Sequence, residues 1–424
     1  MKNNRSMTCS KPIKYFFTLV ALSVLVGCGT KKAATDSSVP SAYQEDGTRI
    51  EVKYELFHYK PDSSRLYVKV NTEHLLYARR GDAPSEAAVV VEITPADQDI
   101  PAKSIRILDD DKAKAPKMLI ASTNLYIPSG KNTELNITLT DENRSRSQKI
   151  KLIADKTDLS NRQNFLITKD NKDVPLFTDR VKPYTNYFLH TNEAITDKIL
   201  VRVYNREFPM PPPPFVLYEP PSFDYTADSV ATIPVNNARP IQIKTGRTGF
   251  YHFHEDDENK KGLTIFVSDS GFPDVKTVED LLSPLRYLMG GREYQNIIDA
   301  PDRKLELENT WIGWAGSRDR ARKTIKTYYR RVENANSYFS SHVEGWKSDR
   351  GIIYIVYGKP NKVYRTEQVE TWIYGEESNP LSVTFHFIKV INPFTDNDYR
   401  LNREELYKPS WYRSVNAWRD GRIY

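Results

Sequence analysis

The chain has 424 residues and a formal net charge of +6 at pH 7, from 61 basic and 55 acidic side chains. Four of the basic residues and none of the acids lie in the first 27 positions, so the remaining 397 residues carry 57 basic and 55 acidic side chains, a net charge of +2. The basic excess therefore belongs mostly to the N-terminal segment. It gives no argument for nucleic-acid binding, and we expect no nucleic-acid partner.

The N-terminal segment has the order of features typical of a secretory signal. Basic residues precede the apolar run Tyr15–Val26, which is too short to span a bilayer. The run ends in Leu-Val-Gly followed by Cys28, which resembles a bacterial lipobox. We therefore expect residues 1–27 to be a lipoprotein signal peptide and Cys28 to be the acylated first residue of the mature chain, anchored in the outer-membrane lipid. Residues 28–47 are rich in Ser, Thr, Ala and Lys and predict a flexible tether.

The cysteine count limits the chemistry of the mature chain. Cys9 and Cys28 are its two cysteines, the first within the predicted signal peptide and the second predicted to be acylated. Disulfides, thiolate metal sites and a cysteine nucleophile are therefore excluded. The residues after Cys28 lack the acidic cluster that resembles surface-export signals in some envelopes, which favours a periplasm-facing anchor.

Residues 48–155 contain seven short β-like runs separated by turn signals such as Arg80-Gly81-Asp82. Seven strands at this spacing predict a β-sandwich (Ig-like) domain. The predicted strands are Ile50–Tyr59, Arg65–Val70, Ala87–Thr94, Ser104–Leu108, Lys117–Ile127, Thr133–Thr140 and Gln148–Ile153.

Residues 156–272 predict a second β-sandwich domain, which the proline-rich segment Phe208–Pro221 interrupts. Consecutive prolines cannot donate to a sheet, so this segment leaves it as an extended loop. The loop is either a stiff connector, which we favour, or a ligand for a partner's aromatic groove. The predicted strands are Tyr187–His190, Lys198–Tyr204, Ser229–Ile233, Ile241–Lys244, Gly249–His254 and Leu263–Ser268.

Residues 273–424 hold all six tryptophans and predict a C-terminal α+β domain on an otherwise mainly β chain. Helices are expected at Val278–Met289 and Asp319–His342, the second with one apolar stripe. The β-branched and aromatic run Ile352–Tyr357 predicts the central strand, followed by strands at Glu370–Tyr374 and Leu381–Ile388. The tail from Asn392 is polar and aromatic, and we expect it to wrap the domain or to meet a partner.

A short segment of this domain has the most distinctive sequence in the chain. Residues 345–349 read GWKSD and are followed by the predicted strand, then by YGKP and ETWIY. These residues resemble the GWxTD domain family of envelope lipoproteins, specifically over residues 311–388, with Ser348 where the family usually has Thr. The resemblance implies a cell-envelope location and envelope partners rather than a reaction. The motif residues, expected to be structural, are Gly345, Trp346, Ser348, Asp349, Arg350, Gly351, Tyr357, Gly358 and Trp372.

The sequence assigns no catalytic residue and no cofactor. His252 and His254 lie two apart on a predicted strand, and residues 255–258 after them are acidic, which is the residue set of a metal site. The acids sit where the hairpin must turn, however, so we expect a solvated loop and no bound metal. Local signatures of hydrolases, metalloproteases and nucleotide-binding enzymes do not occur, although a dispersed catalytic site stays open.

The second predicted helix carries a basic face that is a candidate partner surface. It would bind an acidic protein surface or anionic lipid heads, unless its cations simply pair with acids such as Glu306 and Glu308. Tyr, Trp and Arg are enriched at interface anchors, so the tail tryptophans join this candidate surface. Its residues are Arg320, Lys323, Lys326, Arg330, Trp411 and Trp418.

Together these features predict a non-catalytic, lipid-anchored outer-membrane protein that acts as a scaffold or adaptor in a complex of envelope proteins. One alternative is a glycan- or peptidoglycan-binding accessory lipoprotein, which would need exposed, coplanar aromatic rings. A hydrolase with a dispersed site is the second alternative, and it would need a cleft with converging acid and base groups.

Overall fold

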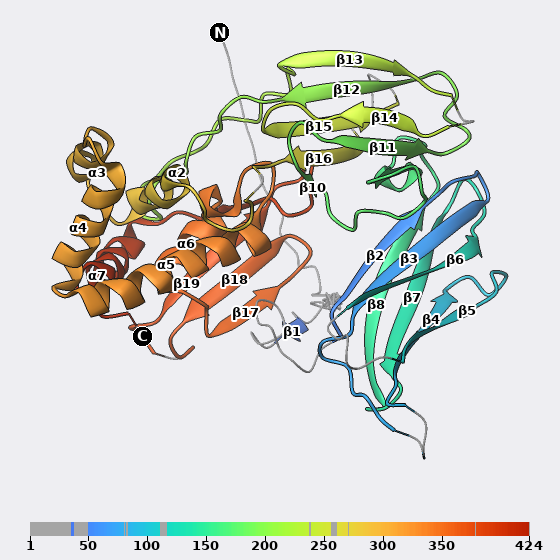
Figure 1. Ribbon diagram of the computed structural model, residues 1–424, viewed down its shortest axis with the longest axis horizontal. Coiled ribbons are helices and arrows are strands. Elements are labelled where there is room, and N and C mark those ends of the chain that lie inside the picture. Colours follow the sequence, from blue (N-terminus) through green and yellow to red (C-terminus); the bar gives the residue numbers. More distant parts are fainter. Residues whose placement is uncertain are drawn as a thin grey trace, which may run out of the picture. The chain divides into compact units, whose positions relative to one another are not determined.

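The computed structural model describes residues 35–37, 50–79, 81, 84–110, 117–236, 239–255, 261–269, 271–377 and 379–423. Strands hold 35% of the chain and helices 23%, which confirms a mainly β protein with a C-terminal α+β region (Figure 1). The predicted signal peptide and Cys28 lie outside the described residues. Among the described helices, none has both the length and the apolar character to cross a bilayer.

The first β region contains all seven strands predicted for it, arranged as two antiparallel sheets in the orders β2-β3-β6 and β5-β4-β7-β8. Inward side chains from both sheets, such as Leu66 and Ile137, share one buried cluster, which makes the pair a sandwich. The strands are β2 (Val52–Phe57), β3 (Ser63–Asn71), β4 (Ala87–Pro95), β5 (Lys103–Asp109), β6 (Met118–Tyr126), β7 (Asn132–Asp141) and β8 (Arg146–Asp155).

The second β region is also a sandwich, built from sheets in the orders β10-β16-β15-β12-β13 and β14-β11-β9 around a second buried cluster. Only β10 pairs in parallel, with β16, among the described strands. The strands are β9 (Phe165–Thr168), β10 (Arg180–Val181), β11 (Asn186–Thr191), β12 (Lys198–Tyr204), β13 (Ser229–Pro234), β14 (Ile241–Lys244), β15 (Gly249–His254) and β16 (Leu263–Val267). The short 3-10 helix η2 (Arg162–Asn164) precedes β9.

The C-terminal region packs helices against an antiparallel sheet in the order β1-β17-β18-β19-β20 (Figure 1). Its strands are β17 (Lys362–Arg365), β18 (Val369–Tyr374), β19 (Val383–Lys389) and β20 (Tyr399–Leu401). Its helices are α2 (Val278–Leu282), η3 (Ser283–Tyr287), α3 (Gly291–Ile298), α4 (Arg303–Ala315), α5 (Arg318–Phe339), η4 (Gly345–Lys347), α6 (Asp349–Tyr357), η5 (Glu405–Tyr407) and α7 (Lys408–Arg419). Thr35–Ser37 form β1, a short strand within the segment predicted to be a tether.

The predicted helix around residues 319–342 is α5, and its apolar stripe faces the core as expected. Ser317 caps it by accepting a hydrogen bond from the Arg320 amide. Phe339 at its end lies 5.3 Å, ring to ring, from Trp372 of β18, so helix and sheet share one core.

The prediction of a central strand at Ile352–Tyr357 is wrong, because Asp349–Tyr357 form helix α6. A short run of apolar residues that is buried on every side shows no hydrophobic periodicity. Its sequence pattern therefore fits a strand and a helix equally well. The caps decide the outcome. Ser348 accepts a hydrogen bond from the Gly351 amide at the N-terminus, and Gly358 takes a positive φ of 84° directly after the last turn.

The C-terminal tail wraps the domain, as one of the two expectations had it. It adds β20 to the sheet edge and then forms α7, whose apolar residues enter the core. Trp411 is 2% exposed and Trp418 is fully buried. Their assignment to a partner surface is therefore wrong, because neither ring is accessible to a partner.

The proline-rich segment packs on this C-terminal region, which favours the connector interpretation. The Pro212 and Pro213 carbonyls accept hydrogen bonds from the Arg403 guanidinium at 2.7 and 2.9 Å. Phe215 packs beside Tyr412, with 5.5 Å between ring centroids. An extended proline-rich backbone leaves its carbonyls unpaired, so they are available to a tertiary partner such as this arginine.

Candidate functional site

The GWKSD segment is a 3-10 turn that leads directly into α6. The Ser348 hydroxyl has two roles: it accepts a hydrogen bond from the Gly351 amide at 3.0 Å and donates one to the Gly345 carbonyl at 2.8 Å. A threonine hydroxyl could make the same two bonds. The exchange of Ser for the family's usual Thr therefore keeps the chemistry of the cap.

Two motif glycines are required by space rather than by backbone conformation. A Cβ on Gly345 would lie 1.8 Å from the Ala335 carbonyl oxygen of α5. A Cβ on Gly351 would lie 1.8 Å from the Gly345 carbonyl oxygen. Because both obstacles are backbone atoms, the turn can pack this closely on α5, and α6 on the turn, only when neither residue has a side chain.

Trp346 is half-buried and packs against the C-terminal core. Its backbone amide donates to Asn336 Oδ1 at 3.2 Å, and its carbonyl accepts from the Tyr287 hydroxyl at 3.3 Å. The Lys347 ammonium lies 5.1 Å from the indole centroid. The ring also lines a cavity of about 660 Å³, so it is not fully enclosed by the domain.

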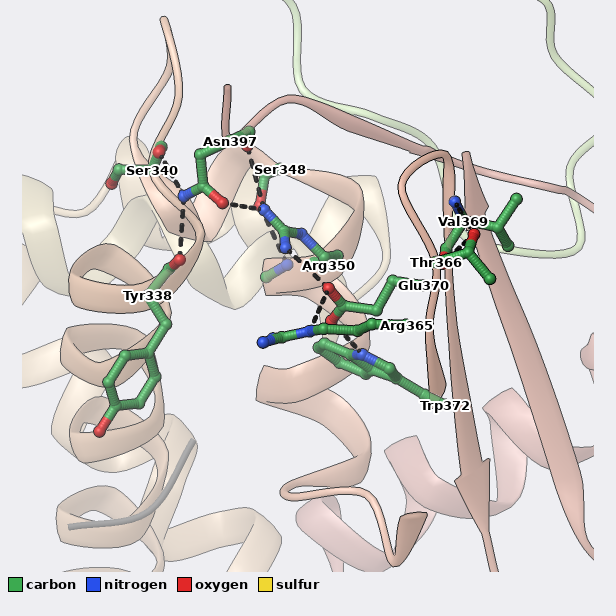
Figure 2. Close-up of polar contacts among 11 residues, drawn as sticks. Tyr338, Ser340, Ser348, Arg350, Arg365, Thr366, Val369, Glu370, Trp372 and Asn397 are labelled. Atoms are coloured by element: carbon green, nitrogen blue, oxygen red, sulfur yellow. Dashed lines mark hydrogen bonds and ion pairs between the residues drawn. The ribbon is translucent and has the colours of Figure 1, made fainter. Parts of the chain in front are cut away.

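Arg350 is the centre of a buried polar network, which Figure 2 shows together with its partners. Its Nη1 lies 3.3 Å from Glu370 Oε2, and its Nη2 donates to both the Asn397 carbonyl and the Asn397 side-chain oxygen. Glu370 also accepts from Trp372 Nε1 at 2.6 Å and from Arg365 Nε at 3.0 Å. Each buried charge thus has several partners, which is the condition under which a buried ion pair is tolerated.

Asn397 joins this network to the end of α5. Its side-chain amide donates to the Tyr338 and Ser340 carbonyls at 3.0 and 2.9 Å (Figure 2). The sequence did not indicate Asn397 or Arg365. Glu370 carried a readable signal: it lies two residues before Trp372 on a predicted strand, which puts a carboxylate on the same buried face as a large ring.

Asp349 links the motif to the tail and to the proline-rich segment. It accepts a hydrogen bond from the Leu401 amide at 2.9 Å and forms an ion pair with Arg403, the residue that also binds the Pro212 carbonyl. Burial raises the pKa of the Asp349 carboxyl, and the nearby Arg403 only partly opposes that shift. These contacts bind Asp349 into the framework of the domain.

The C-terminal end of α6 is covered by cationic and aromatic side chains. Arg331 donates to the Ile355 carbonyl at 3.2 Å and lies over the Trp418 ring at 4.8 Å. A cation at this position complements the negative end of the helix dipole. Burial raises the pKa of the Tyr357 hydroxyl to about 12. The Gly358 carbonyl accepts from the Tyr374 hydroxyl at 2.8 Å.

His252 and His254 are buried, 2% and 1% exposed, on the face of β15 opposite Phe253 of the sandwich core, and the His252 ring lies 5.2 Å, edge-on, from Phe394. Their rings stack at 5.4 Å, and the His252 Nδ1 is 2.9 Å from the Thr264 hydroxyl. The acids at positions 256–258 lie outside the described residues. Within the described residues, no group of three or more potential ligands gathers around these histidines or elsewhere.

The basic face of α5 is exposed, as expected. Its cations form no ion pair with any described carboxylate, and Glu306 and Glu308 of α4 do not reach them. The face has Asp319 as its one acid in the first turn and extends over about 18 Å, at 1.5 Å per residue. We use the name basic face for Arg318, Arg320, Arg322, Lys323, Lys326 and Arg330, all exposed.

Comparison with known proteins finds one family. Residues 249–420 match the GWxTD domain. The match begins at the first residue of β15 and ends just after α7, so it includes the last two strands of the second sandwich. It is longer than the region over which the sequence alone shows the resemblance. No curated protein is significantly similar to the chain.

Among solved structures, the chain is similar to the C-terminal 282-residue fragment of intimin, solved in complex with the intimin-binding domain of the translocated intimin receptor. The identity is 13%, and the similarity covers 84% of this chain and 98% of that chain, with a TM-score of 0.17. A score that low carries no argument about fold or function. The identification rests instead on the match that spans β15, the GWKSD segment, the helices around it and the antiparallel sheet: the chain is a GWxTD domain-containing protein.

Proposed function

We propose that the protein is a non-catalytic, lipid-anchored scaffold or adaptor of the outer membrane, and that its GWxTD domain binds an acidic surface of another envelope protein. The observation that carries this proposal is the basic face of α5. Six exposed cations over about 18 Å, with no carboxylate partner in the described part of the chain, repel one another, and an acidic partner would relieve that repulsion.

The motif residues support a framework role for the rest of the domain. Ser348, Asp349 and Arg350 all bind other parts of the chain, and the two motif glycines allow backbone contact. The membrane anchor in this proposal rests on the lipobox at Cys28. The replacement of Cys28 by Ala should release the protein from the membrane fraction and remove the acyl mass.

A glycan-binding role has less support. Four of the six tryptophans, Trp311, Trp372, Trp411 and Trp418, are at most 2% exposed and therefore offer no sugar-stacking surface. Trp314 meets Trp311 nearly edge-on, at an interplanar angle of 75°, and lies under the Arg419 guanidinium. Trp314 and Trp346 are both half-buried, and of the two only Trp346 lines the cavity.

The test compares two full-length variants with the same change in charge. One carries Arg320→Glu, Lys323→Glu, Lys326→Glu and Arg330→Glu on the basic face. Its control carries Lys53→Glu, Lys103→Glu, Arg146→Glu and Lys149→Glu, four exposed cations of the first sandwich. Crosslinking in intact envelopes followed by purification should recover a defined set of proteins with the wild type and the control, and lose it with the basic-face variant.

Binding to vesicles distinguishes the two anionic surfaces that could bind the basic face, which are an acidic protein and anionic lipid heads. If the purified wild-type protein without its acyl group binds vesicles with anionic lipid heads, and the crosslinked proteins are unchanged in the basic-face variant, the face serves lipid and the adaptor proposal is wrong.

A further inference from the structure

The cavity beside Trp346 lies between the second sandwich and the helices of the GWxTD domain, and its size of about 660 Å³ is that of a small-ligand site. Phe208, Phe266 and Phe272 supply apolar walls, and Asn336, Ser268 and the charged residues supply polar groups. The Trp346 indole forms part of the same wall. The cavity therefore touches the motif that defines the family.

Arg180 is the unusual residue of this cavity. Arg180 is half-buried, and its guanidinium lies between the rings of Phe266 and Phe272, 4.9 and 4.8 Å from their centroids. It donates to Ser268 Oγ at 3.2 Å and to the Ser341 carbonyl at 2.8 Å. A guanidinium has five N–H groups, so three of them have no acceptor among the described residues.

No described carboxylate forms an ion pair with Arg180. Asp179 and Glu344 attract it only from a distance, and burial lowers the pKa of its guanidinium in spite of them. An arginine that is partly withdrawn from water usually has an anionic partner. This cation therefore has the environment of a residue whose partner is a bound anion.

The other cations of the cavity wall are paired. Lys276 lies 3.1 Å from Asp274, Lys347 lies 3.0 Å from Glu344, and Arg206 lies 3.0 Å from Asp228. By contrast, Glu207 and Asp269 are exposed at the wall and have no ion pair among the described residues. The cavity thus combines one unpaired cation inside with unpaired carboxylates toward solvent.

We propose that this cavity binds a short peptide through its free C-terminal carboxylate, which forms a two-point ion pair with Arg180, while a cationic group of the peptide lies near Glu207 and Asp269. The fork of a guanidinium matches a carboxylate geometrically. A phosphate, with up to two negative charges, fits less well because the wall contains six carboxylates: Glu207, Asp269, Asp274, Glu279, Asp280 and Glu344. The apolar walls accommodate the small side chains between the two charged ends.

The test uses the peptide Lys-Ala-Ala with a free C-terminus and the same peptide with a C-terminal amide, titrated into the purified full-length protein by calorimetry. The amide removes the negative charge and leaves the protein unchanged. The loss of a charge-assisted ion pair predicts affinity weaker by about tenfold to a hundredfold for the amide. Equal affinities, or no binding of the acid form at millimolar concentration, would overturn the proposal.

Variants locate the site. Arg180→Gln should weaken binding of the acid form as much as amidation does, and should leave the amide form unaffected. Arg146→Gln, at an exposed arginine of the first sandwich, is the matched control and should bind the acid form like the wild type. If Arg180→Gln lowers the melting temperature, the comparison of the acid and amide peptides, measured as their affinities for the wild-type protein, still tests the proposal. Retained acid-form affinity in a folded Arg180→Gln protein places the peptide elsewhere and overturns the assignment.

Discussion

The GWKSD segment and the basic face of α5 are neighbours in one domain, and both are rich in charge, yet they use charge in opposite ways. Arg350 is 3% exposed and contacts Glu370, Asn397 and the ring of Tyr399. Arg330, on α5, is exposed and has no ion pair among the described residues. The first arrangement stabilises a fold, and the second is available for association.

This comparison explains why a family motif with reactive-looking residues needs no reaction to account for it. A buried ion pair that loses one member leaves an uncompensated charge, whereas an exposed cation loses almost nothing. Substitutions in the motif should therefore act through unfolding, and substitutions on the basic face should act through binding. The following predictions test that division, from the largest effect to the smallest.

Gly351→Ala should prevent the domain from folding, with a loss above about 4 kcal/mol, because the new methyl group would lie 1.8 Å from a backbone oxygen. Circular dichroism and limited proteolysis of the purified protein measure this. Gly313→Ala in α4 is the control, since a Cβ there meets nothing within 4 Å. It should leave the stability unchanged or raise it by about 0.5–1 kcal/mol. A folded Gly351→Ala protein would contradict the close approach of the first turn of α6 to the Gly345 carbonyl.

Glu370→Gln should cost about 3–5 kcal/mol in the free energy of unfolding, because Arg350 would remain buried without its countercharge. Chemical denaturation followed by tryptophan fluorescence measures the change. Glu377→Gln breaks the exposed contact with Lys362 at 2.8 Å and should leave the unfolding midpoint unchanged. Equal effects of the two changes would mean that the network does not stabilise the domain.

Ser348→Ala should cost about 0.5–2 kcal/mol, the usual value for the loss of a helix N-cap. Ser348→Thr should leave the melting temperature within error, because the threonine hydroxyl can make both bonds. Thermal unfolding of the three proteins side by side provides the measurement. A loss in the Thr variant comparable to that in the Ala variant would show that the hydroxyl is not the relevant group.

The four-fold charge reversal on the basic face should leave the melting temperature unchanged while it abolishes crosslinking to envelope proteins. Its cations contribute no ion pairs among the described residues, so the fold has none to lose. A lower melting temperature together with unchanged crosslinking would reverse the comparison and make the face part of the fold.

The sequence predicted the β regions well because their signals are local. Alternating strands such as β7 bury every second residue, and turn residues separate the runs. The stripe of α5 was equally clear. The helix α6 was missed because Ile352–Tyr357 combines high β propensity with burial on every side. The caps at Ser348 and Gly358 were the readable signals, and they outweigh propensity in this context.

The candidate site was predicted only in part, because its partners come from distant segments. The sequence places Arg350 and Trp372 in the motif, but it cannot place Asn397 or Arg403 beside them. The tail tryptophans show the same limit: Trp411 and Trp418 are seven residues apart, a spacing that fits a buried stripe as well as an exposed one. Whether such a stripe faces a core or a partner depends on tertiary contacts that no local pattern contains.

The contacts of the motif with the tail also set an order of events in time. The partners of two motif residues come later in the chain. Asn397 follows Arg350 by 47 residues, and Arg403 follows Asp349 by 54 residues. Until those residues have been synthesised, α6 can form but cannot dock, because docking would bury two charges without partners. A chain that ends before Asn397 would keep this helix open to chaperones and proteases. The domain can therefore close around α6 only after the segment that contains Asn397 and Arg403 is present.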